Sequence, residues 1–175
     1  MRILFYILKQ LLITLLVLAL LGLLLAGSVL AWQGYKLYES AVQQHPIETF
    51  YEEISSRADF VPYSELPQTY LDAVIAVEDE RFALHCGVDP VSILRALLAD
   101  LRAGGFVEGG STITQQLAKN ELFTQEKRMA RKAAEMFAAL ALEKQYNKEQ
   151  ILEMYVNTIY FGSGYYGIRQ AAQGY

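Results

Sequence analysis

An uncharged, leucine-rich stretch from Leu11 to Ala31 limits the structures that this chain can adopt. A helix rises about 1.5 Å per residue, so this stretch would be roughly 30 Å long, the hydrocarbon thickness of a bilayer. Arg2 and Lys9 precede the stretch, and positive residues favour the cytoplasmic side. We therefore expect a cytoplasmic N-terminus at residues 1–9, a single transmembrane anchor at residues 10–32 and an extracytoplasmic remainder.

A cleaved signal peptide is the alternative interpretation of this segment. Ala26-Gly27-Ser28 would be a tolerable cleavage site, but the apolar region of a signal peptide normally spans only about 7–15 residues. Trp32, Tyr35 and Tyr38 follow directly, as expected of an aromatic belt at the outer interface of the membrane. The pattern therefore favours an uncleaved anchor.

The residues after the anchor suffice for one domain with a core of its own. We expect a juxtamembrane helix and linker at residues 33–60 and the domain at residues 61–175. The formal net charge of −4 argues against a nucleic-acid partner. Cys86 is the only cysteine, and neither His45 nor His85 has a second histidine four positions later. The sequence therefore predicts no internal disulfide and no metal site built from protein ligands.

Helix start and stop signals divide the domain into a series of helices. Pro67 suits the first turn of a helix to about Glu80, and Asp89-Pro90 suits the N-cap and first position of the next helix. Apolar periodicity predicts an inner face for that second helix, made of Ile93, Leu94, Leu97, Leu98 and Leu101.

The later segments are also predicted to be helical. After a glycine-rich loop at residues 103–110, Ser111 is expected to cap a helix to about Leu122, and a further helix is expected at residues 127–146. Asn147 and Gln150 have the spacing of a capping box, which predicts a helix to Asn157. Residues 161–167 are expected to turn before a last helical stretch. No convincing alternation of strand residues occurs, so the domain is predicted to be mainly α.

Glu78 is the first candidate for chemistry. It continues an apolar stripe formed by Leu71, Val74 and Ile75, so we expect it on the face that points into the protein. A buried carboxylate usually has a raised pKa, which suits a general acid or base. A solvated acidic turn at the end of a helix explains the same residues equally well.

Two further segments could bind an anion. Residues 109–116 open a helix with small residues and hydroxyls, and free N–H groups at a helix start attract negative charge; on spacing alone, a well-capped helix is the favoured explanation. Arg128, Arg131, Lys132 and Glu135 share one helical face, with Lys119, Asn120 and Lys127 nearby in sequence. This face could clamp a pyrophosphate, although a solvated, salt-bridged face is the commoner meaning of such a pattern.

Together these segments resemble the peptidoglycan glycosyltransferases. The chain has Glu78-Asp79-x-x-Phe82-x-x-His85-x-Gly87, Gly-Gly-Ser-Thr-Ile-Thr-Gln-Gln at residues 109–116, Arg131-Lys132-x-x-Glu135, Lys148-x-x-Ile151-Leu152-Glu153-x-Tyr155-x-Asn157 and Gly164-x-x-Gly167-Ile168-x-x-Ala171-Ala172-x-x-Tyr175. These look like the five motifs of that family, in order. The resemblance covers about residues 61–175. It implies a mainly α, lysozyme-like fold with a large lobe and a small membrane-touching lobe, in the cell (inner) membrane.

The resemblance implies an enzyme that polymerises lipid II into β-1,4 glycan strands. By analogy, Glu78 is the general base and Glu135 the second glutamate, beside the donor pyrophosphate. The residues implied to bind substrate are Asp79, Phe82, His85, Gly110, Ser111, Thr112, Gln115, Gln116, Lys119, Asn120, Lys127, Arg128, Arg131, Lys132, Glu153 and Asn157. No tightly bound cofactor is implied; Mg²⁺ or Mn²⁺ would be held with the donor pyrophosphate. The implied partners are lipid II, the growing lipid-linked strand, the membrane and other cell-wall synthesis proteins.

The chain departs from the family pattern in two places. The family usually has Arg where this chain has Lys127, and Arg128 is the expected substitute. The chain also ends inside the last motif, so the resemblance implies a domain incomplete at its C-terminus and an N-terminal fragment of a longer protein. Two alternatives remain open: a truncated, non-catalytic membrane-tethered protein of cell-wall assembly, and a lysozyme-like muramidase, which would not need the basic helix around Arg131.

Overall fold

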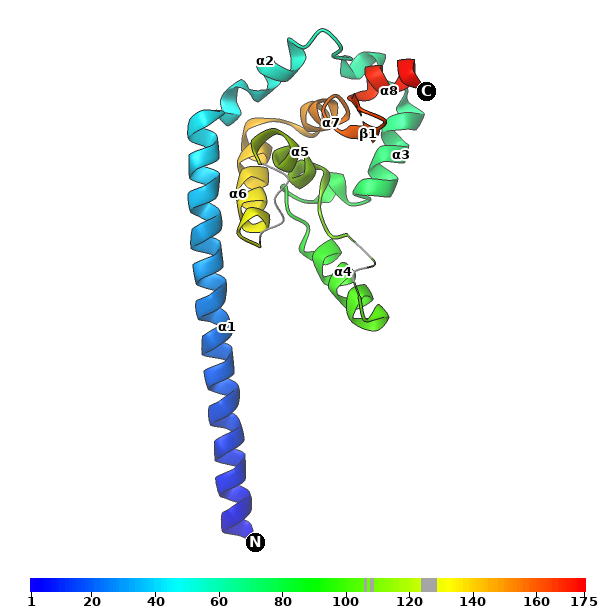
Figure 1. The fold of residues 1–175 in the computed structure, drawn as a ribbon. Coiled ribbons are helices and arrows are strands. Elements are labelled where there is room, and N and C mark those ends of the chain that lie inside the picture. Colours follow the sequence, from blue (N-terminus) through cyan, green and yellow to red (C-terminus); the bar gives the residue numbers. More distant parts are fainter. Residues whose placement is uncertain (106, 108, 124–128) are drawn as a thin grey trace.

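The structure, a computed structural model, describes residues 1–105, 107, 109–123 and 129–175. Figure 1 shows a long N-terminal helix that leads into a cluster of shorter helices. In chain order, the elements are α1 (Arg2–Gln44), η1 (Ile47–Thr49), α2 (Phe50–Ser55), η2 (Tyr63–Glu65), α3 (Gln68–Glu78), η3 (Phe82–Leu84), α4 (Pro90–Ala103), α5 (Ile113–Leu122), α6 (Met129–Gln145), α7 (Lys148–Val156), β1 (Tyr160–Gly162), β2 (Tyr165–Tyr166) and α8 (Ile168–Gly174).

The prediction of a mainly α fold is confirmed. Strand structure in the described residues is limited to the antiparallel pair of β1 and β2. Gly162, Ser163 and Gly164, which connect the two strands, all have positive φ angles, so this turn needs the conformational freedom of glycine. The strands are too short to give a period-two pattern, which is why the sequence predicted only a turn there.

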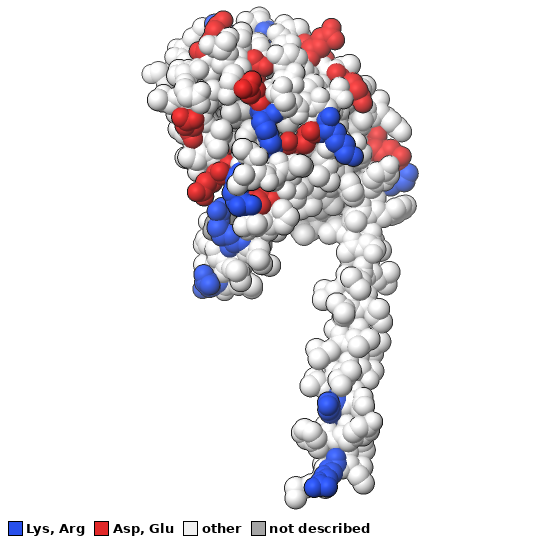
Figure 2. Space-filling model, turned by 180° about the vertical axis from the view of Figure 1, so that it is seen from behind, with Lys and Arg blue, Asp and Glu red and all other residues white. Residues whose placement is uncertain are grey.

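The expected anchor lies within α1. Among the described residues, α1 is the one helix long and apolar enough to cross a membrane, with a mean hydropathy of 2.7 over its most apolar window. Figure 2 shows charged side chains near the N-terminal end of this helix and none along its middle on the face in view. The helix does not break at residue 32 but continues to Gln44, and its last turns pack against α6.

The core of the domain forms where α5, α6 and α7 meet, and α2 and η1 cover one side of it. Ile113, Leu117, Leu142, Ile151 and Met154 are fully buried there. Two capping boxes start the helices at this core. One uses Asn147 and Gln150, as predicted. The other uses Thr112 and Gln115, so the predicted cap at Ser111 is wrong by one residue, and the Ser111 hydroxyl is left for other contacts.

The predicted inner face of α4 is not an inner face. Leu94, Leu97, Leu98 and Leu101 are exposed, Ile93 in the first turns is half-buried, and Ala96 is the buried residue of this helix. The periodicity is real, but no described element packs against the stripe. Figure 1 shows α4 extending away from the core, on the same side of the domain as the N-terminal half of α1 but diverging from that helix. The helix is therefore held mainly at its first turns.

Asp89 holds the start of α4. Its carboxylate accepts hydrogen bonds from the Val91 amide at 3.0 Å and the Ser92 hydroxyl at 2.7 Å, and it pairs with Arg81 at 2.9 Å. Burial raises the pKa of the Asp89 carboxyl, but these hydrogen bonds and the Arg81 charge outweigh burial, and the pKa lies below its ordinary value of 3.8. A carboxyl with a lowered folded-state pKa stabilises the fold above its unfolded-state pKa and loses that effect as the pH falls through the folded-state pKa.

We expect Asp89→Ala to lower the free energy of unfolding by about 1–3 kcal/mol at neutral pH, because the helix loses its cap and Arg81 loses its partner. The difference from wild type should shrink as the pH falls from about 4, where the carboxyl of the unfolded state gains a proton, through the lower folded-state pKa of Asp89. Urea unfolding at pH 7 and at acid pH measures both effects. A difference that stays constant with pH would show that the cap contributes no charge effect.

Candidate functional site

A cleft of about 250 Å³ opens between the end of α3, the start of α5 and the first turns of α4. Its walls bring together two of the sequence segments singled out above, the acidic segment after Val77 and the glycine-rich segment before α5. The lining residues are Ala76, Val77, Glu78, Asp79, Glu80, Ser92, Arg95, Val107, Gly109, Gly110, Ser111 and Thr112.

Glu78 lies at the last position of α3 and is exposed to this cleft. The prediction that it points into the protein is wrong. Leu71 is the buried residue of α3, while Val74 and Ile75 are only half-buried. The apolar stripe therefore emerges from the core before it reaches Glu78, and the carboxylate meets solvent and any bound ligand.

Gln116 on α5 fixes the orientation of the Glu78 side chain. Its Nε2 atom donates a hydrogen bond to Glu78 Oε2 at 2.8 Å, and its Oε1 atom accepts one from the Tyr155 hydroxyl at 3.2 Å. Burial, followed by the nearby charge of Glu78, raises the pKa of Tyr155, so this hydroxyl keeps its proton. Because Tyr155 donates to the amide oxygen, the amide NH₂ group faces the Glu78 carboxylate.

Asp79, next to Glu78, is buried and holds the surrounding loop together. Its Oδ2 atom accepts hydrogen bonds from His85 Nε2 at 2.9 Å and from the Ile113 amide at 3.0 Å. His85 Nδ1 in turn accepts from the Gly87 amide at 3.1 Å, so the ring proton lies on Nε2. Asp79 therefore connects the end of α3 to the start of α5, and fixes Glu78 relative to Ser111.

Asp79→Asn tests this connection with almost no change in shape. An amide oxygen at the Oδ2 position can still accept from Ile113, but the amide NH₂ group then replaces Oδ1, which lies 3.1 Å from His85 Nε2. With the ring proton on Nε2 this NH₂ group faces a donor, and with the proton on Nδ1 the Gly87 amide faces one. We expect the free energy of unfolding to fall by about 2–4 kcal/mol, since buried groups lose their partners. Chemical denaturation of the detergent-solubilised protein measures the loss. Asp72→Asn, on the exposed side of α3 where an amide can still accept from Gln68, is the control and should change it by less than about 0.5 kcal/mol.

Lys132 of α6 contacts the cleft at Ser111, and Arg131 lies beside it on the same helix. Lys132 Nζ donates to the Ser111 hydroxyl at 2.5 Å and lies 3.0 Å from Glu135 Oε2, while Arg131 Nε lies 3.0 Å from Glu135 Oε1. Glu135 is only 2% exposed. A buried carboxylate that holds two cations in place forms a preorganised site for an anion, because those cations keep donors that can face a ligand.

The predicted substrate-binding residues divide into two groups. The buried ones, Phe82, Thr112, Gln115, Glu153 and Asn157, are engaged within the protein. Thr112 and Gln115 form the capping box, and Glu153 accepts from the Tyr63 amide at 2.6 Å. Asn157 binds the backbone of Val61, and the Lys148 ammonium lies over the Phe82 ring. We therefore interpret these five, with Asp79 and His85, as residues that position the cleft.

The other group is accessible. Gly110 and Ser111 line the cleft, Gln116 reaches Glu78, and Lys132 reaches Ser111. Lys119 and Asn120 are half-exposed further along α5. Lys127 and Arg128 lie outside the described residues.

Sequence reasoning missed several residues of the cleft, above all Arg95 of α4. Its guanidinium lies 3.9 Å from the carboxylate of Glu80, another lining residue. Ser92 and Arg95 are one turn apart on the helix side opposite the leucine stripe, a polar spacing that could have indicated a second use for this helix.

No group of three His, Cys, Asp or Glu side chains in the described parts of the chain has a geometry that could hold a metal ion. Both oxygens of Glu135 already face cations. The expected divalent cation, which would be held with the donor pyrophosphate, stays a prediction.

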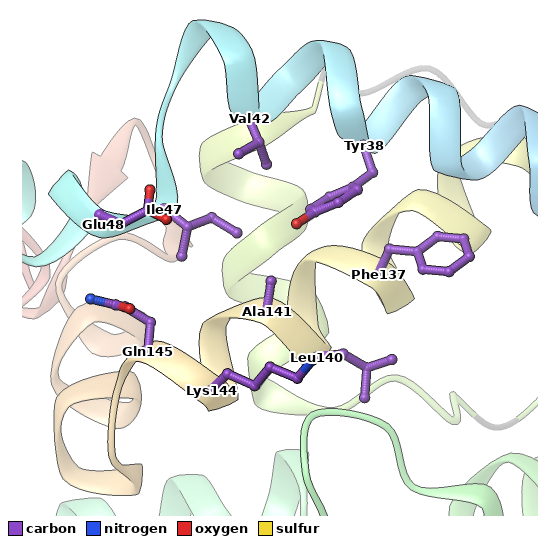
Figure 3. Close-up of a pocket in the computed structure, with 9 residues that line it drawn as sticks. All are labelled: Tyr38, Val42, Ile47, Glu48, Phe137, Leu140, Ala141, Lys144 and Gln145. Carbon is purple, nitrogen blue, oxygen red and sulfur yellow. The ribbon is translucent and has the colours of Figure 1, made fainter.

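A second cavity, of about 430 Å³, lies between α1, η1 and α6. Figure 3 shows Tyr38 and Val42 of α1 opposite Phe137 and Ala141 of α6 across this space. Its walls combine apolar side chains with the charged groups of Glu48 and Lys144. It contains none of the candidate catalytic groups.

Comparison with known proteins gives consistent matches. A family model described as "Transglycosylase" matches residues 43–175. Penicillin-binding protein 1F of Bacillus subtilis is 51% identical over 115 residues, which are 66% of this chain and 16% of that protein. Penicillin-binding protein 1A/1B of the same organism is 40% identical over 176 residues, covering 94% of the chain and 19% of the relative. Penicillin-binding protein 1A of Haemophilus influenzae is 42% identical over 174 residues, with coverages of 95% and 20%. The chain thus spans a fifth or less of the length of these relatives.

Proposed function

The chain belongs to the transglycosylase family, and from this membership we propose that it is a peptidoglycan glycosyltransferase that polymerises lipid II. One observation supports this reaction above all. The carboxylate of Glu78 and the Lys132–Ser111 contact belong to one cleft, so a proton acceptor and an anion-binding group act on one bound pair of substrates.

In the proposed reaction, Glu78 takes the proton from the 4-hydroxyl of the acceptor sugar. That oxygen attacks the anomeric carbon of the donor, a new β-1,4 bond forms, and the bond between this carbon and the pyrophosphate breaks. The electron pair leaves with undecaprenyl pyrophosphate. Because a single in-line displacement inverts the α-linked donor, no covalent enzyme intermediate is required.

The surrounding residues would support each part of this step. Gln116 would hold the Glu78 carboxylate in one orientation at the cleft, as a general base requires. Lys132 and Arg131, held in place by Glu135, would neutralise the negative charge that the donor pyrophosphate already carries when it binds. A divalent cation bound to the pyrophosphate would add further neutralisation of that charge.

Both proposed substrates carry lipid tails, which would give the apolar surfaces of α1 and α4 a role in binding the membrane. We propose that α1 anchors the protein in the cell membrane with its N-terminus in the cytoplasm, and that the exposed leucines of α4 rest on the same membrane. Confinement to the membrane raises the rate at which enzyme, lipid II and the lipid-linked strand meet. Other cell-wall synthesis proteins are further proposed partners.

Lipid II polymerisation by the detergent-solubilised chain tests the function. Glycan strands separated by gel electrophoresis would support the glycosyltransferase. Sugar released from preformed strands, without polymer from lipid II, would favour the muramidase instead. Binding of lipid II with neither product would favour a non-catalytic, membrane-tethered protein of cell-wall assembly.

A further inference from the structure

We propose that Gly34 of α1 is a positioning residue for the anion side of the cleft, because its close contact with α6 fixes where Lys132 and Glu135 lie. This inference rests on the proposed function, since it assigns Lys132 to the donor pyrophosphate. It makes the membrane anchor a part of the site and not only a tether.

The contact at Gly34 is unusually close. Gly34 is the buried residue of α1, whose remaining described residues are exposed or half-buried. A Cβ atom at this position would overlap the Cβ atom of Ala133 and would lie 3.0 Å from both the carbonyl oxygen of Ala130 and the amide nitrogen of Ala134. The two helix backbones therefore approach each other as closely as a glycine allows.

The contact continues along both helices. The Tyr35 and Phe137 rings meet edge to face with centroids 5.6 Å apart, and Tyr38 lies 6.2 Å from the same ring. Further on, Val42 and Ala141 line the cavity between the helices (Figure 3). The two helices run in the same direction, and among the described elements they share the most extensive contact (Figure 1). The position of α6 is thus set largely by α1.

The site residues of α6 lie in the same two turns as this contact. Ala130, Ala133 and Ala134 face Gly34, while the intervening Lys132 and the adjoining Glu135 carry the ion pair described above. A displacement of α6 away from α1 therefore moves Lys132 directly. Because Lys132 reaches Ser111 through a single hydrogen bond of 2.5 Å, a shift of about 1 Å along it would stretch this contact to the limit of hydrogen-bond geometry.

Gly34→Ala is the decisive substitution. Alanine is favoured over glycine in a helix by about 0.8–1.0 kcal/mol, so propensity alone would make this change stabilising. Gly22→Ala and Gly27→Ala are matched controls in α1, because a Cβ atom there has nothing within 4 Å. We expect Gly34→Ala to raise the KM for lipid II about tenfold and to change kcat less than about twofold, as expected for a displaced binding group. Both controls should match wild type.

Two combinations test the mechanism. Ala133→Gly removes the Cβ atom that position 34 would meet first, so Gly34→Ala together with Ala133→Gly should recover most of the lost affinity relative to Ala133→Gly alone. In a Lys132→Met background, Gly34→Ala should raise KM by clearly less than it does in wild type, because the main group that it displaces is gone.

A fall in kcat at unchanged KM would overturn the inference, since it would mean that a fraction of the protein is misfolded. Equal behaviour of Gly34→Ala and Gly27→Ala would overturn it as well. If wild type binds lipid II without polymerising it, the proposed function fails. The effect of Gly34→Ala is then compared with that of Gly27→Ala through the dissociation constant of lipid II in detergent micelles. If wild type does not bind lipid II at all, both proposals fail.

Discussion

Glu78→Gln is expected to lower the rate of lipid II polymerisation by about 10²–10⁴-fold, the usual effect of removing a general base. The substitution keeps the length of the side chain and still accepts a hydrogen bond from Gln116, so the cleft should keep its shape. Binding of lipid II should stay within about threefold of wild type, because the amide removes a proton acceptor and no contact to the pyrophosphate. Single-turnover polymerisation and equilibrium binding of lipid II measure the two quantities separately.

Glu52→Gln, an exposed glutamate of α2 away from the cleft, is the matched control and should behave as wild type. Polymerisation by Glu78→Gln at more than a tenth of the wild-type rate would exclude Glu78 as the base. An equal loss in both variants would instead point to a change in the preparation.

The sequence predicted the elements of the fold well, because helix ends are encoded locally. Asp89 caps α4 and the Asn147–Gln150 pair caps α7, as their spacing indicated. The misplaced cap at Ser111 shows the limit of such signals. Two adjacent hydroxyl residues can both cap a helix, and only the partner three positions later, Gln115, selects Thr112.

Burial was harder to predict than helix position. The leucine stripe of α4 has the same periodicity as the apolar face of a core helix, yet it is exposed. Periodicity shows that a helix has an apolar face, but it does not show whether protein or lipid covers that face. The prediction that Glu78 is buried was wrong for a related reason. Its apolar neighbours Val74 and Ile75 are themselves only half-buried, so the last residues of the stripe lie at the surface of the domain.

The contacts within the site lay beyond sequence reasoning. The Tyr155–Gln116–Glu78 connection joins three helices, and the Lys132–Ser111 contact joins residues from two separate motifs. Spacing along the chain contains no information on such pairs. The resemblance to a family supplied the candidate residues, and the structure then distinguished those that face the cleft from those, such as His85, that hold it in shape.

Lys132→Met is expected to lower kcat/KM for lipid II by about 10–100-fold, mainly through KM. The ammonium makes charge-assisted hydrogen bonds to Ser111 and Glu135, and a group of this kind on a pyrophosphate contributes about 1.5–3 kcal/mol. Methionine keeps an unbranched side chain of similar length but carries no charge. Donor binding therefore weakens for two reasons that act in the same direction, since a cation is lost and the negative charge of Glu135 is less neutralised.

Lys144→Met on the same helix provides the comparison. Lys144 is exposed and lines the separate cavity between α1 and α6, so the identical substitution there should leave KM within about twofold of wild type, as surface changes usually do. Steady-state polymerisation at varied lipid II concentration gives both constants for each variant.

Lys132→Arg separates charge from geometry. Arginine retains the positive charge, but its planar head cannot reproduce the single short contact of the ammonium with Ser111. If charge alone binds the donor, this variant should match wild type. If position matters as the contact with α1 implies, KM should lie between the values for wild type and Lys132→Met. A Lys132→Met enzyme with unchanged KM would contradict both forms of the argument, because it would exclude Lys132 from donor binding.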